Sequence, residues 1–337
     1  MKHIASILAF ISVLLVSCTN KEVYHKESGT RFHTLYHITY KSTKPLTEAI
    51  DSTMSVFNAS LNPFDSTSLV SRINRNETDT LDNMMLDVLA VAKDVYMASG
   101  GVFDITGAPL FNIWGFGTKK GVTRPATREE IDSIMTFVGH DKLIVDETMR
   151  RITKADPRMS IIPSSLSKGY ITDLVAATLE ANGVTDYMVE IGGEMVCKGI
   201  NPQGDCWQIG VNKPIEDNTS TISELMSKVS MCEKAGLASS GDYRNYHSLE
   251  GQKVSHTIDV RTGYPAGQDI LSATVIAPTC ILADAWATTF MALGMKESLK
   301  ILDSHPELKV IFIYADEGGN FKVYERGIEA IPINDNR

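Results

Sequence analysis

Asp284 and Thr288 form a pair of oxygen-bearing side chains that could bind a metal ion. They lie four positions apart within a predicted helix over residues 280–293, so they share one face of it. A carboxylate and a hydroxyl oxygen together suit a hard cation such as magnesium, which takes few protein ligands and leaves room for phosphates and water. A side-chain hydrogen bond across one helical turn would account for the same pair. Both interpretations stay open on spacing alone.

His256 is the side chain best suited to carry a proton near neutral pH. It lies on a predicted strand over residues 254–260, after the hydroxyl-rich stretch 238–244 that contains Ser239 and Ser240. The alternative is a half-buried histidine whose ring nitrogens bond to the backbone. We therefore treat His256 as a candidate general base.

A predicted helix over residues 164–181 could hold a phosphate group at its start. Pro163 and two serines lead into it, and the free amides and dipole of a helix N-terminus attract anions. Lys168, one turn further on, would add a positive charge. The stretch is not a Walker A loop, because the Gly-x-x-x-x-Gly spacing before the lysine is absent. A capped helix with a solvated lysine is the structural alternative.

Two glycine-containing stretches carry isolated carboxylates. Asp104 lies within the apolar segment 101–110, which glycines and a proline interrupt. There it could accept hydrogen bonds from a ligand or from the amides of its own turn. Gly192 and Gly193 end a predicted strand between Glu190 and Glu194. A Gly-Gly pair by itself most often marks a bulge or a turn.

The composition is that of an ordinary folded protein of 337 residues, long enough to bury a sizeable core. Hydrophobic residues make up 43% and charged residues 22%, which excludes wholesale disorder, a coiled coil and a polytopic membrane protein. The formal net charge is −9 and the acidic residues form no single block. We expect no nucleic-acid partner, because a phosphate backbone requires a basic surface. A small phosphorylated ligand remains compatible with this charge.

The first residues are typical of a bacterial lipoprotein. Met1–His3 gives a positive start, residues 4–16 are almost entirely apolar, and a small residue precedes Cys18. We predict a signal peptide over 1–17, a lipidated tether over 18–28 with the lipid on Cys18, and one domain over 29–337. The protein would be anchored to a membrane of the bacterial cell envelope and face the periplasm. An ordinary secretory signal is the alternative, and no later segment is long and apolar enough to be a membrane helix.

Four further cysteines make no metal-binding pattern, because none belongs to a Cys-x-x-Cys arrangement. Cys197 and Cys206 flank the turn over residues 199–204, so facing hairpin strands could bring them together as a disulfide. Two small buried residues would explain them as well. An oxidising envelope permits a disulfide but does not require one.

Hydrophobic periodicity predicts short strands alternating with longer helices. Besides the segments named above, we expect helices over 47–60, 80–99 and 129–138, and strands over 34–40, 187–191, 207–211, 273–276, 310–314 and 321–324. Strand pairs joined by short turns outnumber clear β-α-β units. The expected fold class is therefore α+β, with largely antiparallel sheets and packed helices.

Taken in order, the motifs resemble the ApbE family of flavin transferases along nearly the whole mature chain. That family moves FMN from FAD onto a Thr or Ser of a partner protein. The matching segments are Thr34-x-Tyr36-x-Ile38, Ser68–Asn74, Gly101–Thr106, Lys168–Tyr170 with Asp173, Gly192–Glu194, Ser239–Tyr243, His256–Asp259 with Thr262-Gly263, and Ala283–Ala285 with Thr288. Such an ordered series is hard to produce by chance. It implies an ApbE-like flavin transferase fold for the domain.

The resemblance also implies roles for individual residues. Magnesium would be held by the Asp284 carboxylate, the Thr288 hydroxyl and a backbone carbonyl at about Ser165. The flavin and adenosine of FAD would be bound by residues from several motifs, with two phenylalanine rings packed against the ligand. These residues are Val102, Phe103, Asp104, Lys168, Asp173 and Ile258, with Phe32 and Phe64 as the packing rings.

The expected reaction follows from charge. The pyrophosphate of FAD repels an incoming alcohol, so magnesium would neutralise it and make AMP a better leaving group. His256 would take the proton of the attacking Thr or Ser hydroxyl. The acceptor would be a redox protein, such as a subunit of a membrane redox complex. Two alternatives stay open: hydrolysis of FAD to FMN and AMP at the same site, and a non-catalytic flavin-binding lipoprotein.

Overall fold

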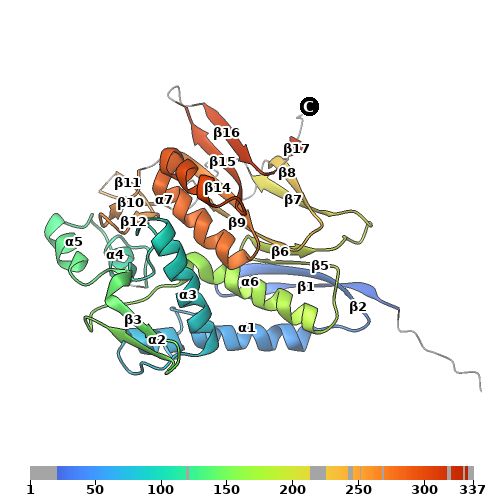
Figure 1. Cartoon of the computed structure of the whole chain (residues 1–337), viewed down its shortest axis with the longest axis horizontal. Coiled ribbons are helices and arrows are strands. Elements are labelled where there is room, and N and C mark those ends of the chain that lie inside the picture. The colour runs from blue at the N-terminus through green and yellow to red at the C-terminus, as the bar shows by residue number, and fades with distance from the viewer. Residues whose placement is uncertain are drawn as a thin grey trace, which may run out of the picture.

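The computed structural model describes residues 21–118, 121–212, 225–241, 246–250, 252–267, 269–316, 320–328 and 331–332. Eight of the described strands form a central sheet in which every neighbouring pair runs antiparallel (Figure 1). In spatial order they are β1 (Val23–Arg31), β2 (Thr34–Ser42), β5 (Tyr187–Ile191), β6 (Glu194–Lys198), β9 (Ala235–Gly241), β14 (Ile270–Ala277), β15 (Lys309–Ala315) and β16 (Phe321–Arg326).

Helices cover one face of the central sheet. α6 (Ser164–Ala181) packs on β5 and β6, and α7 (Cys280–Ser304) packs on β9 and β14. α1 (Thr47–Leu61) and α3 (Asn83–Ala98) lie against these two helices in turn (Figure 1). The side chains between these layers form the main hydrophobic core, which includes Tyr187 and Phe290. The arrangement follows from the apolar stripe of each helix and the alternating buried residues of each strand.

A second, smaller sheet covers the opposite face. It contains β7 (Trp207–Asn212), β8 (Leu225–Met231) and β17 (Ile331–Pro332). Trp207 and Val229 from this sheet pack with Leu237 and Ile276 from the central sheet in one buried cluster. The described chain is thus layered as helices, large sheet and small sheet.

A third cluster of buried side chains lies beside the helical layer. It is built from α4 (Ala108–Ile113), α5 (Arg128–Met135) and two hairpins, with Trp114 and Ile258 among its members. The hairpins are β10 (Tyr246–Leu249) with β11 (Gln252–Ser255), and β12 (Ile258–Asp259) with β13 (Tyr264–Pro265). The remaining elements are α2 (Leu69–Asn74), a 3-10 turn (His140–Lys142) and the hairpin of β3 (Leu143–Asp146) and β4 (Arg151–Lys154).

The expected α+β class with largely antiparallel sheets is confirmed, but the bounds of several predicted elements differ, one through a break and another through a continuation. The strand expected over 254–260 is interrupted at His256 and Thr257, between β11 and β12. The helix expected to end at Gly294 resumes beyond it and reaches Ser304. Gly294 adopts φ 74° and ψ 174°, a conformation that glycine reaches easily, so it kinks α7 without ending it.

A strand begins inside the segment predicted to be a tether. Val23 already pairs with Ser42, and the β1–β2 ladder continues from there to Arg31. β1 is an edge strand with many exposed polar side chains, which is why its sequence resembles a solvated tether. The predicted signal peptide and Cys18 lie outside the described residues. Among the described residues, no helix has the length and hydrophobicity needed to cross a bilayer.

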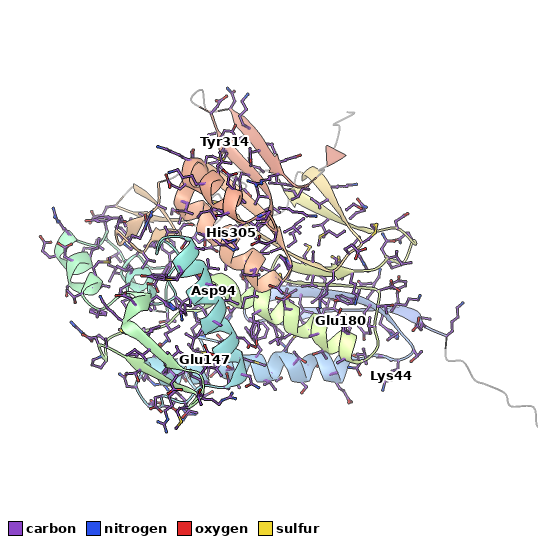
Figure 2. All side chains as sticks on the ribbon, in the orientation of Figure 1. Lys44, Asp94, Glu147, Glu180, His305 and Tyr314 are labelled. Atoms are coloured by element: carbon purple, nitrogen blue, oxygen red, sulfur yellow. A yellow bond between two sulfur atoms is a disulfide. The ribbon has the colours of Figure 1, made fainter. Side chains whose placement is uncertain are left out.

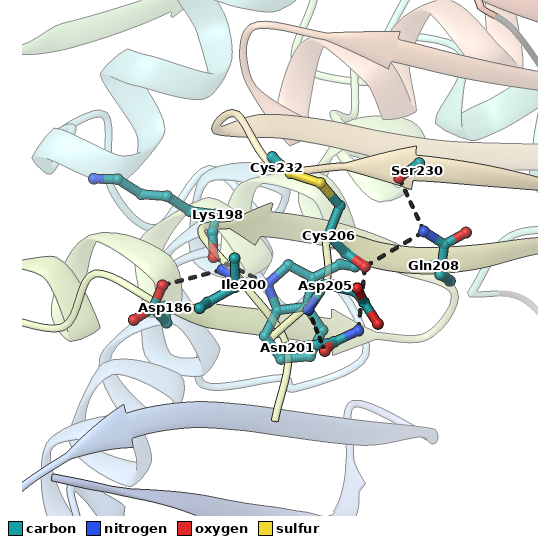
Figure 3. Close-up of a disulfide and its surroundings, with 10 residues drawn as sticks. Asp186, Lys198, Ile200, Asn201, Asp205, Cys206, Gln208, Ser230 and Cys232 are labelled. Carbon is teal, nitrogen blue, oxygen red and sulfur yellow. Dashed lines mark hydrogen bonds between the residues drawn. A yellow bond between two sulfur atoms is a disulfide. The ribbon is translucent and has the colours of Figure 1, made fainter. Parts of the chain in front are cut away.

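The disulfide joins Cys206 to Cys232, not Cys206 to Cys197 (Figure 3). Cys206 precedes β7 and Cys232 follows β8, so the bond ties together the two ends of that strand pair. Closing a loop with a sequence separation of 26 stabilises the fold by about 3.5 kcal/mol in the chain-entropy model. Cys197 and Cys280 are buried thiols, and Cys197 belongs to the cluster between the two sheets.

The C-terminal end of α6 is fixed by charge. Glu180, labelled in Figure 2, accepts hydrogen bonds from the ammonium groups of Lys198 at 2.8 Å and Lys234 at 2.7 Å. Those two bonds join α6 to the end of β6 and to the segment before β9. The helix is thereby held at one end, while its N-terminal end faces the cavity described next.

Candidate active site

A cavity of about 720 Å³ lies between the helical layer and the cluster around α4 and β12. This volume is within the range of ligand-binding pockets. Most of the residues singled out in the sequence line it: Phe64, Val102, Phe103, Asp104, Ser165, Lys168, Ser239, Ser240, His256, Ile258, Asp284 and Thr288. Segments far apart in the chain therefore meet at one place.

The predicted metal ligands lie together on two helices. Asp284, 3% exposed, and Thr288 are on the second and third turns of α7, and Ser165 is on the first turn of α6. The backbone N–H of Gly169 donates to Oδ2 of Asp284 at 2.9 Å. Burial raises the pKa of Asp284 above its ordinary value, while the charge of Lys168 opposes that rise.

The donor set fits magnesium better than a transition metal. It offers one carboxylate, one hydroxyl and backbone oxygen, which are hard ligands. In the described part of the chain, no three His, Cys, Asp or Glu side chains gather into a metal-binding group. A cation held here would thus have few protein ligands, which suits an ion that keeps phosphate oxygens and waters in its shell.

A partly buried ion pair adjoins Asp284. The Lys168 ammonium, on α6, contacts Oε1 of Glu194, the first residue of β6. The Lys168 side chain is 42% exposed and lines the cavity, whereas the Glu194 side chain is 2% exposed. Burial alone would lower the pKa of Lys168, but the charges of Glu194 and Asp284 outweigh it and raise that pKa.

His256 faces the cavity from the break between β11 and β12. Its ring lies 6.3 Å from the Phe116 ring in an edge-on arrangement. Thr257, the next residue, is buried, and its carbonyl accepts a hydrogen bond from the amide of Ala266 at 2.8 Å, which fixes the backbone at this break. A proton acceptor therefore lines the same cavity as the predicted metal ligands.

The remaining wall is apolar and carries one carboxylate. Val102, Phe103 and Ile258 are buried there. Asp104 accepts hydrogen bonds from the amides of Thr106 and His140, both at 2.8 Å. Burial raises the pKa of Asp104, and the two amides oppose the rise. Phe64 is 54% exposed at the rim and offers a ring for stacking.

Asp173 and Phe32 are not among the residues that line this cavity. Asp173 instead accepts hydrogen bonds from the amides of Cys280 and Ile281, both at 2.9 Å. It caps the start of α7, and burial raises its pKa to about 6. The carboxylate oxygens of Asp173 thus position the start of α7. The contact of Asp173 with the ligand stays a prediction.

Phe32 packs away from the predicted metal ligands. Its ring lies edge-on to Phe57 at 5.1 Å, and it lines a neighbouring cavity of about 450 Å³ together with His33 and Met54. His33 in turn approaches Phe64 with ring centres 6.3 Å apart. Only Phe64 of the two predicted rings therefore lines the main cavity.

Sequence reasoning missed the pairing of Glu194 and the role of Gly169. The Gly-Gly pair before Glu194 was visible in the sequence, but it indicated only a turn. Gly169 follows Lys168 directly, and a Cβ there would lie 2.2 Å from the carbonyl oxygen of Cys280. In the sequence, the small residue Gly169 next to Lys168 was the one indication that two helices approach closely at this point.

Known proteins resemble this chain in sequence. The model of the ApbE family matches residues 32–312. The chain belongs to the ApbE family. A relative from Haemophilus influenzae named FAD:protein FMN transferase is 34% identical over 94% of both chains, and one of that name from Vibrio cholerae is 31% identical over 93% of both.

Solved structures of ApbE proteins match about nine-tenths of this chain. The flavin transferase ApbE from Vibrio cholerae has a TM-score of 0.80 at 28% identity, covering 91% of this chain and 98% of the other. The apo form of the flavinyl transferase ApbE from Pseudomonas stutzeri has a TM-score of 0.78 at 26% identity, covering 91% and 96%. The expected ApbE-like fold and family are therefore confirmed.

Proposed function

We propose that this ApbE-family transferase moves FMN from FAD onto a Thr or Ser hydroxyl of an acceptor redox protein and releases AMP, with magnesium bound at Ser165, Asp284 and Thr288. One observation carries the proposal. A phosphate-attracting helix start, a set of hard oxygen ligands and a histidine all line one cavity, although they come from three distant segments. The names of the relatives supply the substrate and the group transferred.

The chain's own groups account for the binding of FAD. The N-terminal end of α6, with Lys168 one turn in, offers amides and a positive charge to the pyrophosphate. Asp104 and the buried Val102 and Phe103 form a wall for a ring system, and Phe64 lies at the rim. Magnesium, when bound, would neutralise charge on the pyrophosphate and on the departing AMP.

Transfer requires one bond to form and one to break at the FMN phosphorus. The acceptor hydroxyl oxygen forms the new P–O bond, and the P–O bond to AMP breaks with its electron pair leaving on AMP. His256 takes the hydroxyl proton, since it lines the cavity that holds the pyrophosphate. The acceptor is recognised as a protein with an accessible Thr or Ser.

The test is a mass measurement on the acceptor. Incubation with FAD, magnesium and a candidate redox subunit should add the mass of FMN less one water to that subunit, with AMP released in equal amount. Release of free FMN and AMP with no labelled acceptor would support a hydrolase. FAD that stays intact while bound would support a flavin-binding lipoprotein.

We also propose that the protein is lipid-anchored at Cys18 and faces the periplasm. The Cys206–Cys232 bond supports export, because disulfides persist in oxidising compartments. Cys18→Ser should move the protein from the membrane to a soluble fraction. A Cys18→Ser protein that remains membrane-bound would contradict the lipid anchor.

A further inference from the structure

Three charged groups adjoin the cavity: the half-exposed Lys168 and the buried Glu194 and Asp284. Only Lys168 and Asp284 have a task in the proposed reaction. Glu194 does not line the cavity, and the proposed chemistry makes no use of it. We propose that Glu194 is a positioning residue that holds the Lys168 ammonium away from Asp284 and so keeps that carboxylate open to a divalent cation. The inference rests on the magnesium site of the proposed function.

The local backbone is built to bring Glu194 to Lys168. Gly192 and Gly193 have φ 69° and 100°, conformations that L side chains rarely adopt, so the β5–β6 turn depends on glycine there. A Cβ on Gly192 would lie 3.3 Å from Cδ of Lys168, so this turn packs along the lysine stem. Glu194 then meets the ammonium group as the first residue of β6.

The charges of Glu194 and Asp284 explain why the Lys168 ammonium must be held away from Asp284. The fields of both Glu194 and Asp284 act on Lys168, and the field of Lys168 acts on both carboxylates. An ammonium group paired directly with Asp284 would occupy the carboxylate that a cation needs. The ion pair with Glu194 gives the ammonium another partner. It also pairs the carboxylate of Glu194, whose side chain is 2% exposed and whose charge would be costly to bury alone.

The two carboxylate oxygens of Glu194 differ in their contacts, and this difference indicates that the residue is placed to hold Lys168. Oε1 contacts the lysine, whereas Oε2 is buried without a hydrogen-bond partner among the described residues. A buried carboxylate whose only role was to accept hydrogen bonds from backbone amides would be expected to accept them with both oxygens. Glu194 thus carries a desolvation cost that its contact with Lys168 offsets.

The experiment is a double-mutant cycle read by the binding of magnesium alone, measured by isothermal titration calorimetry. Glu194→Gln should weaken Mg²⁺ binding by about 10- to 100-fold, as is usual for residues that position metal ligands. In the Lys168→Met background the same Glu194→Gln change should alter Mg²⁺ binding less than about threefold, since no ammonium group is left to compete.

Two further variants separate position from charge. Glu194→Asp keeps the negative charge but is too short to reach the lysine, so it should weaken Mg²⁺ binding as Glu194→Gln does. Glu190→Gln removes a carboxylate charge at the other end of the same turn but keeps a side-chain oxygen that can accept from the Gly193 amide, so it should leave Mg²⁺ binding unchanged. Melting curves of every variant verify that the protein is folded.

The outcomes distinguish the two proposals. If the unaltered protein binds no Mg²⁺ either alone or with FAD present, the metal site of the proposed function is wrong. If it binds Mg²⁺ but Glu194→Gln weakens binding equally with and without Lys168, or Glu194→Asp binds normally, Glu194 acts only through its charge and the inference is overturned. The metal site would then stand without it.

Discussion

Gly169 donates its backbone N–H to the carboxylate of Asp284 at 2.9 Å, across 115 positions of sequence. The bond forms because α6 and α7 approach closely at this glycine. A Cβ at Gly169 would lie 2.2 Å from the carbonyl oxygen of Cys280, a separation that real Cβ atoms do not show. Because glycine has no side chain, Gly169 allows the close helix contact that places Asp284, the predicted metal ligand.

Gly169→Ala should separate the two helices at the cavity. Such overpacking costs about 1–3 kcal/mol, so the melting temperature should fall and Mg²⁺ binding should weaken with it. Gly267→Ala is the matched control, because a Cβ there meets nothing within 4 Å. A Gly169→Ala protein with unchanged melting temperature and Mg²⁺ binding would show that the helix contact does not position Asp284.

Asp284→Asn should abolish FMN transfer by removing the charged oxygen ligand of the metal. Thr288→Ala removes a neutral ligand and should be milder, with activity partly restored by excess magnesium. Both positions are on α7, which the core holds in place along its length, so circular dichroism should show folded proteins. Full transfer by Asp284→Asn in the presence of chelator would contradict the metal mechanism.

His256→Asn should lower the rate of FMN transfer by about two to four orders of magnitude, the usual worth of a positioned base. FAD binding should stay near normal, because other residues are proposed to hold the ligand. Binding, melting temperature and single-turnover transfer are best measured on the same preparation. A structural histidine would give the reverse: lower melting temperature and weaker FAD binding, with the single-turnover rate of the folded protein unchanged.

Asp173 should make stability depend on pH. Burial raises its pKa from 3.8 to about 6 in the folded protein, so between these values the folded state binds more protons than the unfolded state. Its contribution to stability therefore falls as pH rises from about 4 to 6, by up to about 1.4 kcal/mol per pH unit. Asp173→Asn should gain stability relative to the unaltered protein over this window in urea titrations. A difference between the two that is independent of pH would contradict the prediction.

Local signals fixed the elements that carry the site. The helix expected over 164–181 has those bounds in the structure, because Pro163 begins it and Asn182-Gly183 ends it within the sequence itself. The four-residue spacing of Asp284 and Thr288 likewise required only a helix to place both on one face. The strand around His256 was less certain, since its break between β11 and β12 depends on packing against α4 and α5.

Partners distant in sequence were decided by the tertiary structure. Asp173 follows Lys168 by five positions and looked like a second ligand-binding residue, but the amides of α7, more than a hundred positions away, take up its oxygens. Cys206 pairs with Cys232 and not with the nearer Cys197, because Cys197 is buried between the two sheets.

The sequence by itself determined the family, the fold class and most residues of the cavity. Helical periodicity and capping depend on residues close together in the chain, and the order of the motifs can be read directly from the sequence. The tertiary structure alone decided that Glu194 pairs with Lys168 and that Gly169 meets Asp284. A glycine or a carboxylate has the same neighbours in sequence whether or not a residue from a distant segment contacts it in the folded protein. Its role is set by which elements the buried side chains bring together, and that is a property of packing in three dimensions.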